Sequence, residues 1–507
     1  MPHLNLNVPV WDLDVPNTNM NKHIFLLLLL VSTQIQATTF FNIRDFGAKG
    51  DGKTIDSPAI NAAIDAASLA GGGTVVFPSG TFASYSIRLK SNITLQLEAG
   101  AVLLAAIPEN GIGYDAAEPN DFKQYQDFGH SHWHNSLIWG ENLENINICG
   151  QGLIDGAGLT RGEKYIPGIG NKAISLKLCR NVTLGDIKML MCGHFALLAT
   201  GIDNMTIDNL LIDTNRDGLD IDCCRNVRVS NCSVNSPWDD AIVLKACYSL
   251  GFFKDTEAVT ITNCFVSGYD KGTVLNGTYQ TKNYSTVPDK EPPTGRIKLG
   301  TESSGGFKNI AISNCTFQNC RGLALETVDG GMLEDVVISN ISMRDIFNSP
   351  IFLRLGARLR SPENTPIGKM RRITIDNVNV YNADSRFGCL LSGLPGNYIE
   401  DVKLSNIRIV YKGSGTKEQA AVLVPENEKE YPEPAMFGTI PSSAFYIRHV
   451  KNIEISNVEV SFMTSDVRPS VQLEDVKASF FRNVKIEQPE APKTFVLKNS
   501  DKPVVLK

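Results

Sequence analysis

A short strand-like phrase recurs along most of this chain and restricts the possible folds more than any other feature. Examples are RNVTLGDIKML, DNMTIDNLLI, RNVRVSNCSV, KNIAISNCTF and KNIEISNVEV. Each has apolar residues at alternate positions, a polar turn often bearing Asn, and a second short strand. Val182, Met205 and Val227 hold equivalent positions, 23 and 22 residues apart. So small a unit must stack on its neighbours to bury its apolar side, which predicts an all-β, single-stranded parallel β-helix with coils about 4.8 Å apart.

One helix is predicted ahead of the coils, in DSPAINAAIDAASLAGGG. Asp56 or Ser57 is expected to cap it, Pro58 to lie in its first turn and Gly71 to end it. Its apolar stripe consists of Ile60, Ala63, Ile64 and Ala67. We expect this stripe to close the open end of the coil stack, where core and unpaired backbone would otherwise face water.

The chain before the repeats has the pattern of a secretory signal. Residues 20–37 contain a lysine, an apolar run from Ile24 to Val31 and the small residue Ala37. The run is too short to span a bilayer, although an anchored N-terminal segment is the alternative. We interpret residues 1–19 as a mis-start or added extension, 20–37 as a leader and 38–507 as one β-helix domain. The expected location is the periplasm or the cell exterior, without membrane contact after leader removal.

Charge and cysteine spacing narrow the possible partners and cross-links. The net charge of −6, without any long Lys/Arg run, argues against a nucleic-acid partner. Eleven cysteines in an exported chain suggest disulfides, but Cys232, Cys264 and Cys315 hold the same place in successive repeats. We expect these three to be small buried residues stacked in register rather than disulfide partners. We also expect the protein to be a monomer.

Several charged residues are predicted to face outward from one sheet. Because Leu219 and Ile221 should point inward, Asp220 and Asp222 should point out. The same alternation exposes, on the following coils, Lys245, Arg296, Lys298, Glu326 and Arg354. Stacked strands would present these side chains as one column of mixed charge, suited to a polar, partly anionic polymer. A solvated face with incidental ion pairs is the alternative.

Three further aspartates break the alternation. Asp239 and Asp240 are neighbours and cannot both lie on one face of a regular strand, while Asp217 stands at a strand entrance before Gly218. Turns of adjacent coils would bring the three carboxylates within several ångströms. Glycoside hydrolysis uses such a set, with one carboxylic acid to protonate the leaving oxygen and one or two carboxylates to activate water. Crowded like charges also raise one pKa, which keeps the acid protonated.

At these residues the sequence resembles the polygalacturonase-like glycoside hydrolases of family 28. The resemblance spans FNIRDFGAKGDGKTIDSPAINAAID, HNSLIWGENLENINICGQGLIDG, NRDGLDIDCCRNV, PWDDAIVLK and GTESSGGFKNI. It implies a right-handed parallel β-helix that hydrolyses a pectic polysaccharide or oligosaccharide with inversion. The family's Asn-Thr-Asp motif falls on Asn215, Arg216 and Asp217, and its Asp-Asp pair on Asp239 and Asp240. That mapping makes Asp239 the general acid, whereas Asp217 and Asp240 hold and deprotonate the water.

Two departures from the family pattern alter the expected substrate contacts. Thr294 stands where the family has a histidine, and Ala324 and Glu326 stand where it has the arginine and lysine that recognise a galacturonate carboxylate. We expect Arg296 and Lys298 to replace them. Rhamnogalacturonan-cleaving relatives also lack that basic pattern, so the resemblance favours altered subsites over a plain endo-polygalacturonase. The insertion before Thr294 could wall one end of a groove and give action from a chain end.

Other candidates for substrate contact are histidines and tryptophans. In GHSHWHNSLIW, histidines alternate with other residues, but no Cys or carboxylate follows at ligand spacing, so neither a metal nor another cofactor is expected. His132, Trp133 and His134 are instead predicted to contact sugar. His194, one coil before the first aspartate, could replace the missing histidine, and Trp238 could stack on a sugar or pack the turn.

Two other functional classes fit the same fold. A polysaccharide lyase would bind calcium at the aspartates and abstract a proton with Arg296 or Lys298, giving unsaturated products and sensitivity to chelator. A non-catalytic carbohydrate-binding β-helix would use the aspartates only structurally, so Asp239→Asn would change nothing measurable.

Overall fold

The computed structural model describes residues 39–109, 111–127, 129–162, 166–281, 293–487 and 494–506. The predicted extension and leader lie outside these residues. Among the described residues, no helix has the length and apolar character needed to span a membrane.

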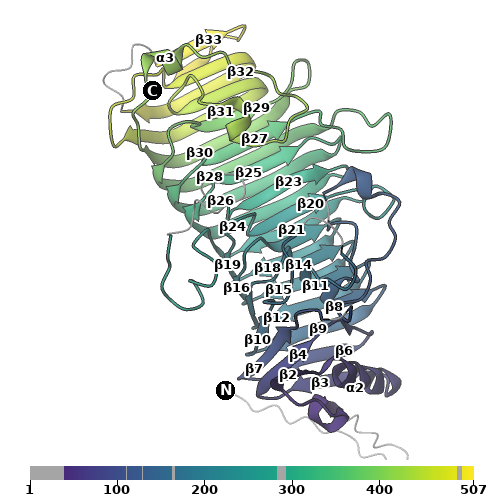
Figure 1. The fold of residues 1–507 in the computed structure, drawn as a ribbon. Helices are drawn as coiled ribbons and strands as arrows, with labels where there is room; N and C mark the ends of the chain where they lie inside the picture. The colour runs from purple at the N-terminus through teal and green to yellow at the C-terminus, as the bar shows by residue number, and fades with distance from the viewer. Residues whose placement is uncertain are drawn as a thin grey trace, which may run out of the picture. The chain divides into compact units, whose positions relative to one another are not determined.

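The described chain forms a right-handed parallel β-helix, as the repeat and the resemblance predicted. Each coil contributes strands to three parallel ladders, and the coils stack in sequence order from α2 at one end to β32 near the other (Figure 1). From β24 onward the first two strands of a coil merge into one long strand, so β24 pairs with both β21 and β22.

The strands divide among the ladders by their pairing. The first ladder contains β1 (Phe40–Asn42), β3 (Gly73–Phe77), β6 (Ile93–Leu97), β9 (Glu144–Gly150), β12 (Arg180–Gly185), β15 (Asp203–Asp208), β18 (Arg225–Ser230), β21 (Thr256–Thr262), β24 (Phe307–Cys320), β26 (Met332–Ile346), β28 (Lys369–Ala383) and β30 (Ile399–Tyr411). The second contains β2 (Asp51–Ile55), β4 (Gly80–Ser84), β7 (Ala101–Ala105), β10 (Leu153–Asp155), β13 (Lys188–Leu190), β16 (Leu211–Asp213), β19 (Ser233–Asn235) and β22 (Phe265–Ser267).

The third ladder carries the residues discussed below. It contains β5 (Ile87–Arg88), β8 (Ser136–Glu141), β11 (Lys172–Lys177), β14 (Phe195–Thr200), β17 (Asp217–Asp222), β20 (Ile242–Ala246), β23 (Ile297–Ser303), β25 (Leu323–Thr327), β27 (Ile351–Leu355), β29 (Cys389–Ser392) and β33 (Phe495–Lys498). The long strands β31 (Phe445–Phe462) and β32 (Val471–Ile486) run through the third and first ladders, and β34 (Val504–Leu506) pairs with β32.

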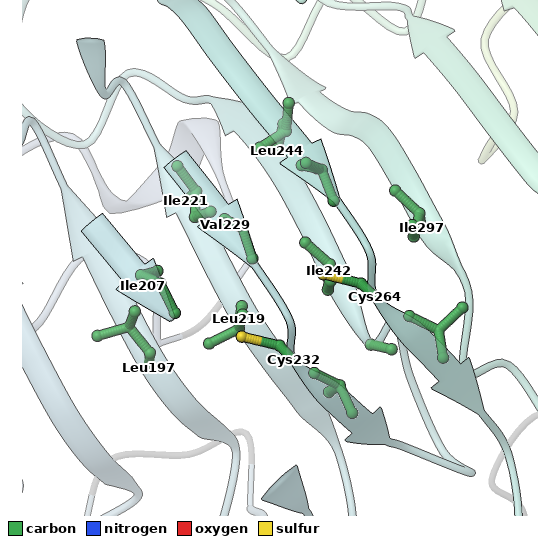
Figure 2. Packing of buried hydrophobic residues seen from close by; sticks show 14 of the residues in the cluster. Leu197, Ile207, Leu219, Ile221, Val229, Cys232, Ile242, Leu244, Cys264 and Ile297 are labelled. Carbon is green, nitrogen blue, oxygen red and sulfur yellow. The ribbon is translucent and has the colours of Figure 1, made fainter. Parts of the chain in front are cut away.

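Apolar side chains from successive coils stack in register inside the helix. Leu219 pairs with Ile242, which pairs with Ile297, and Ile221 pairs with Leu244. All five are fully buried, and Figure 2 shows them in rows across neighbouring strands. The predicted inward positions are therefore confirmed. Because the interior is filled by these rows, polar chemistry is confined to the outward face and the turns.

Asparagines turn the chain between ladders. Asn181, Asn204 and Asn226 occupy equivalent positions with φ of 56°, 62° and 56°. Asparagine tolerates this left-handed conformation better than other residues that carry a Cβ. The Asn204 amide also donates to Asn181 Oδ1 at 3.1 Å, and that of Asn226 donates to Asn204 Oδ1 at 2.8 Å. The recurrent Asn of the repeat thus both turns each coil and bonds it to the next.

Helix α2 (Ser57–Leu69) covers the N-terminal coils, where it packs against β1, β3 and β5. The four residues of its predicted apolar stripe are all fully buried. Asp56 holds the N-cap position, but its carboxylate accepts from the backbone N–H groups of Lys49 and Gly50 instead, at 2.7 and 3.0 Å. The remaining helical segments are short: η1 (Ile43–Phe46), η2 (Lys123–Tyr125), α3 (Lys417–Ala420) and η4 (Pro434–Phe437).

The cysteines form no disulfide among the described residues, and most of them are buried. All eleven lie among the described residues as free thiols. Cys232, Cys264 and Cys315 are buried in successive coils, as predicted from the repeat, and two of them are labelled in Figure 2.

We predict that Asn204→Ala lowers the free energy of unfolding by about 1–2 kcal/mol, because alanine resists the left-handed backbone. Asn204→Gly keeps that backbone and loses only the exposed amide bonds, so it should be much milder. Chemical denaturation of both variants measures the difference. Equal destabilisation would show that the amide bonds, rather than the backbone conformation, select asparagine.

Candidate active site

Two adjacent turns of the third ladder bring the three predicted catalytic aspartates together. Asp217 is the first residue of β17, while Asp239 and Asp240 lie in the turn before β20. One carboxylate oxygen from each lies within 4.8 Å of the others. A Cβ at Gly218 would lie 2.3 Å from Ala241 O, so only glycine allows the two turns to approach this closely. The geometry that the sequence required of these residues is therefore present.

Asp240 is surrounded by cations. Arg296 Nε donates to its Oδ1 at 2.9 Å, and Lys298 Nζ lies 3.5 Å from its Oδ2. Burial opposes ionisation of this side chain, but Lys298, Arg296 and Lys245 outweigh it and lower the pKa of Asp240. Asp240 is consequently a carboxylate that stays ionised although it is only 3% exposed.

Asp217 has the opposite environment. It is also 3% exposed. Burial and the negative charge of Asp239 raise the pKa of Asp217 well above its ordinary value. Asp239 is more accessible, with 27% of its side chain exposed, and it accepts from Arg216 Nε at 3.0 Å. Asp217 therefore keeps its proton more readily than Asp240 does.

Arg216 connects this pair to His194. Its Nη1 donates to His194 Nδ1 at 2.9 Å. Burial and the charge of Arg216 hold the pKa of His194 well below its ordinary value, so the imidazole accepts as a neutral ring. His194 is buried, and the structure places it behind Arg216 rather than at an exposed face. Asn215 is half-buried and accepts from Thr214 Oγ1 at 3.4 Å.

The outward charges form two columns rather than the single predicted column. Asp222 pairs in register with Lys245, whereas Asp220 pairs with Val243, which in turn pairs with Lys298 on the following coil. Glu326 pairs with Arg354. Long loops cover this face, so all of these side chains are buried rather than displayed to solvent. The expectation of an open charged ladder is corrected: without water, the charges must satisfy one another.

Within this covered layer each charge has a protein partner. Lys245 bonds Glu302 at 2.7 Å and lies 3.8 Å from Asp220, which His130 Nε2 contacts at 3.1 Å. Asp222 accepts from the backbone N–H of Cys247 at 2.9 Å. Lys298 lies 3.4 Å from Glu326. Burial, Lys298 and Arg296 act together on Glu326, and its pKa rises to about 7 because burial prevails.

Arg354 lies beneath a loop. Its guanidinium donates to the carbonyl oxygens of Glu426 and Asn427 at 2.9 and 3.0 Å, and to Ser392 Oγ at 2.9 Å. It is 1% exposed. Arg354 thus holds the loop between β30 and β31, and the structure does not bring it to the aspartates.

The histidine-rich segment is also placed differently from the prediction. Residues 130–134 precede β8 and are not a strand. Trp133 is fully buried, with its Nε1 donating to Thr200 Oγ1 at 3.0 Å, which excludes sugar stacking. His132 Nδ1 bonds the Glu118 carbonyl oxygen at 2.8 Å, and His134 stacks on Trp139 with ring centroids 3.9 Å apart. These contacts fix the covering loop.

Trp238 is half-buried next to Asp239. The Arg161 guanidinium lies 3.6 Å from its ring centroid and the Lys271 ammonium 4.9 Å from it. Two cations therefore lie over this ring, consistent with cation–π attraction.

The sequence reasoning missed two residues on the loop between β30 and β31. Tyr431 OH lies 3.3 Å from Lys298 Nζ, and the tyrosine is 49% exposed. Glu433 contacts Arg296 and Arg321, the latter at 3.1 Å. They lie more than a hundred residues beyond the aspartates in an irregular segment, and no repeat or motif marked them.

Comparisons with known proteins give two matching family models and several related enzymes. A model described as "Glycosyl hydrolases family 28" matches residues 84–288, and one described as "Rhamnogalacturonase A/epimerase, pectate lyase-like" matches residues 40–106. A probable polygalacturonase of Vitis vinifera is 26% identical over 67% of this chain and 74% of its own. An exo-poly-alpha-D-galacturonosidase of Dickeya chrysanthemi is 23% identical over 70% of this chain and 64% of its own.

A solved structure shares the fold. It is the family 28 exopolygalacturonase of Yersinia enterocolitica, with a TM-score of 0.63 and 19% identity over 87% of this chain and 78% of that chain. The chain is a glycosidase, and its residues 84–288 match the model of glycoside hydrolase family 28.

We predict that Asp217→Asn removes activity and stabilises the fold at neutral pH. The pKa of Asp217 is higher in the folded chain than in the unfolded chain. Asp217 therefore contributes stability at a pH below its unfolded-state pKa, and this contribution is lost as the pH rises through its folded-state pKa. Asparagine avoids the buried charge, so the unfolding midpoint should rise at neutral pH and the gain should disappear in acid. Activity should fall by about 10²–10⁴-fold. Exposed Asp121→Asn is the control, and a lower midpoint at neutral pH would contradict the account.

Proposed function

We propose that this chain hydrolyses α-glycosidic bonds of a pectic polysaccharide, either galacturonan or rhamnogalacturonan, with inversion and from a chain end. The observation that carries the proposal is the gathering of Asp217, Asp239 and Asp240, with their different environments, at two adjacent turns. Relatives named as polygalacturonases support the pectic substrate.

The environments suggest a division of labour. Asp240, held ionised by Arg296 and Lys298, accepts a proton from water as that water attacks the anomeric carbon. The bond from this carbon to the leaving oxygen breaks, and Asp239 protonates that oxygen. Asp239 suits this role because it is the most exposed of the three. Asp217 lies beside both residues and helps to orient the water.

The covered outward face supports action at a chain end. On the C-terminal side of the aspartates, Phe437 and Ile440 of the loop between β30 and β31 pack on Ala324, Phe352 and Leu390. On the N-terminal side, Trp133 packs on Phe195 and Leu198 of β14. A polymer cannot lie along a sheet face that is covered on both sides of the reaction centre, but a chain terminus can enter between the covers.

A lyase mechanism is less favoured by the same contacts. Arg296 and Lys298 would need to give up a proton before acting as bases. Burial opposes their charge, but Asp240 and Glu433 for Arg296, and Asp240 and Glu326 for Lys298, raise both pKa values well above the ordinary ones. These side chains are therefore poor bases. They also already bond protein carboxylates, so they are less available to a sugar carboxylate than the sequence suggested.

The proposed enzyme is exported, because a polymer of plant cell walls lies outside the cytoplasm. Residues 20–37, with their leader-like pattern, are the segment that would direct it.

We predict that homogalacturonan or rhamnogalacturonan oligomers release saturated monosaccharide from the first time points, whereas random internal cleavage would first give mixed oligomers. Chromatography of timed samples measures the product. Unsaturated, ultraviolet-absorbing sugar that disappears with chelator would establish the lyase instead. Absence of product from both polymers would remove pectin as the substrate.

We also predict inversion at the anomeric carbon, observed by proton NMR within the first minutes of hydrolysis. Carboxyl groups of inverting pairs are usually about 6.5–9.5 Å apart, and retaining pairs about 5–5.5 Å. The oxygens here lie within 4.8 Å, below the first range. In most inverting enzymes the water lies between a distant acid and base. Inversion here therefore requires the water to bind beside Asp217 and Asp240 instead. Net retention would assign one of the aspartates as a nucleophile.

A further inference from the structure

The loop of residues 412–444 between β30 and β31 is held in one arrangement by contacts outside the reaction centre. Arg354 donates to the carbonyls of Glu426 and Asn427, and Arg448 donates to those of Val424 and Pro425 at 2.9 and 2.8 Å. The apolar cluster around Phe437 adds further packing. These anchors hold the loop through residues other than Glu433, on both sides of it in the chain.

Glu433 gathers donors that precede three different strands. Arg296 Nη1 donates to its Oε2 at 3.3 Å, and Arg296 Nη2 bonds its Oε1. Arg321 Nη1 donates to Oε1 and Asn348 Nδ2 to Oε2, both at 3.1 Å. Both carboxylate oxygens are therefore engaged, and both terminal nitrogens of Arg296 are fixed.

Arg296 transmits this constraint to Asp240. The guanidinium is a rigid plane, so fixing its two Nη atoms also fixes the direction of Nε. That Nε donates to Asp240 Oδ1 at 2.9 Å. Arg296 is 2% exposed, which leaves it little room for another rotamer. The orientation of the carboxylate that accepts the proton of water thus depends on a residue nearly two hundred positions later.

We propose that Glu433 is a positioning residue for the glycosidase reaction, acting through Arg296 to hold Asp240 in its reactive orientation. The inference rests on the proposed function. Glu433 also fills the space in front of Arg296 and Arg321 with a carboxylate of the protein itself. Arg296 and Arg321 therefore bind carboxylates of the protein beside the proposed water-activating residue, and they are not available to bind a sugar carboxylate.

The test compares Glu433→Gln with Glu430→Gln, a change at an exposed position of the same loop. Misplacing a reacting group by about 1 Å costs on the order of 10²-fold, so Glu433→Gln should lower kcat about 10–100-fold while KM changes less than about 3-fold. Glu430→Gln should match the wild type. Activity is measured on whichever pectic oligomer the wild-type enzyme cleaves.

A double-mutant cycle separates positioning from loop support. The cycle introduces Glu433→Gln into the Arg296→Lys variant, which has already lost the guanidinium that links Glu433 to Asp240. If Glu433 acts through Arg296, Glu433→Gln should change the kcat of that variant by less than about 2-fold. The proposal would be overturned if the two substitutions lowered kcat by independent factors that multiply in the double variant. It would also be overturned if Glu433→Gln changed only KM or left kcat unchanged. Wild-type enzyme inactive on every pectic oligomer would instead overturn the proposed function.

A milder variant covers the case in which Glu433→Gln does not fold. Asn348→Ser removes one donor to Glu433 and leaves all charges paired. It should lower kcat by about 2–5-fold, and that effect should also vanish in the Arg296→Lys background. Persistence of the effect in that background would contradict transmission through Arg296.

Discussion

Register between parallel strands is the constraint on which the rest of this molecule depends. A one-residue slip would turn every inward side chain outward, so the buried rows of Leu219, Ile242 and Ile297 lock each coil to the next. With the register fixed, the turn before β20 must lie against the start of β17. The carboxylates of Asp217, Asp239 and Asp240 are therefore juxtaposed by core packing that lies on the opposite side of the sheet.

Burial then determines how the charges behave. Loops cover the outward face of the third ladder, and removing water from so many ionised groups is unfavourable unless each has a partner. Asp240 is placed among cations, whereas Asp217 faces another carboxylate, so two chemically identical side chains acquire opposite protonation tendencies. The same partners that make the layer stable thus separate a carboxyl group that stays ionised, Asp240, from one that keeps its proton more readily, Asp217.

The sequence predicted the regular part of the structure and much less of the irregular part. Alternating apolar residues, recurrent asparagines and the stripe of α2 are local patterns, and the strands, turns and helix that they indicated are present. The approach of Asp217 to Asp239 and Asp240 followed from coil spacing alone. Trp133, Arg354 and the charged column were misjudged because alternation reports which way a side chain leaves the strand, not what lies above it. Tyr431 and Glu433 come from a loop without a repeat, so only the folded chain reveals them.

The strands of each coil pair only with strands of adjacent coils, and this affects how such a chain can change over time. The site draws on the stretch from β14 to β27 and on one returning loop. Whole coils could be duplicated or deleted ahead of β7 or beyond β31 while the reaction centre kept its composition, because strands pair only with those of adjacent coils and the covering loops arise between these limits. Inside that stretch the same event would separate Arg296 from Asp240 by a full step of the stack. Length is therefore free to vary at the ends of this solenoid and is fixed in its middle.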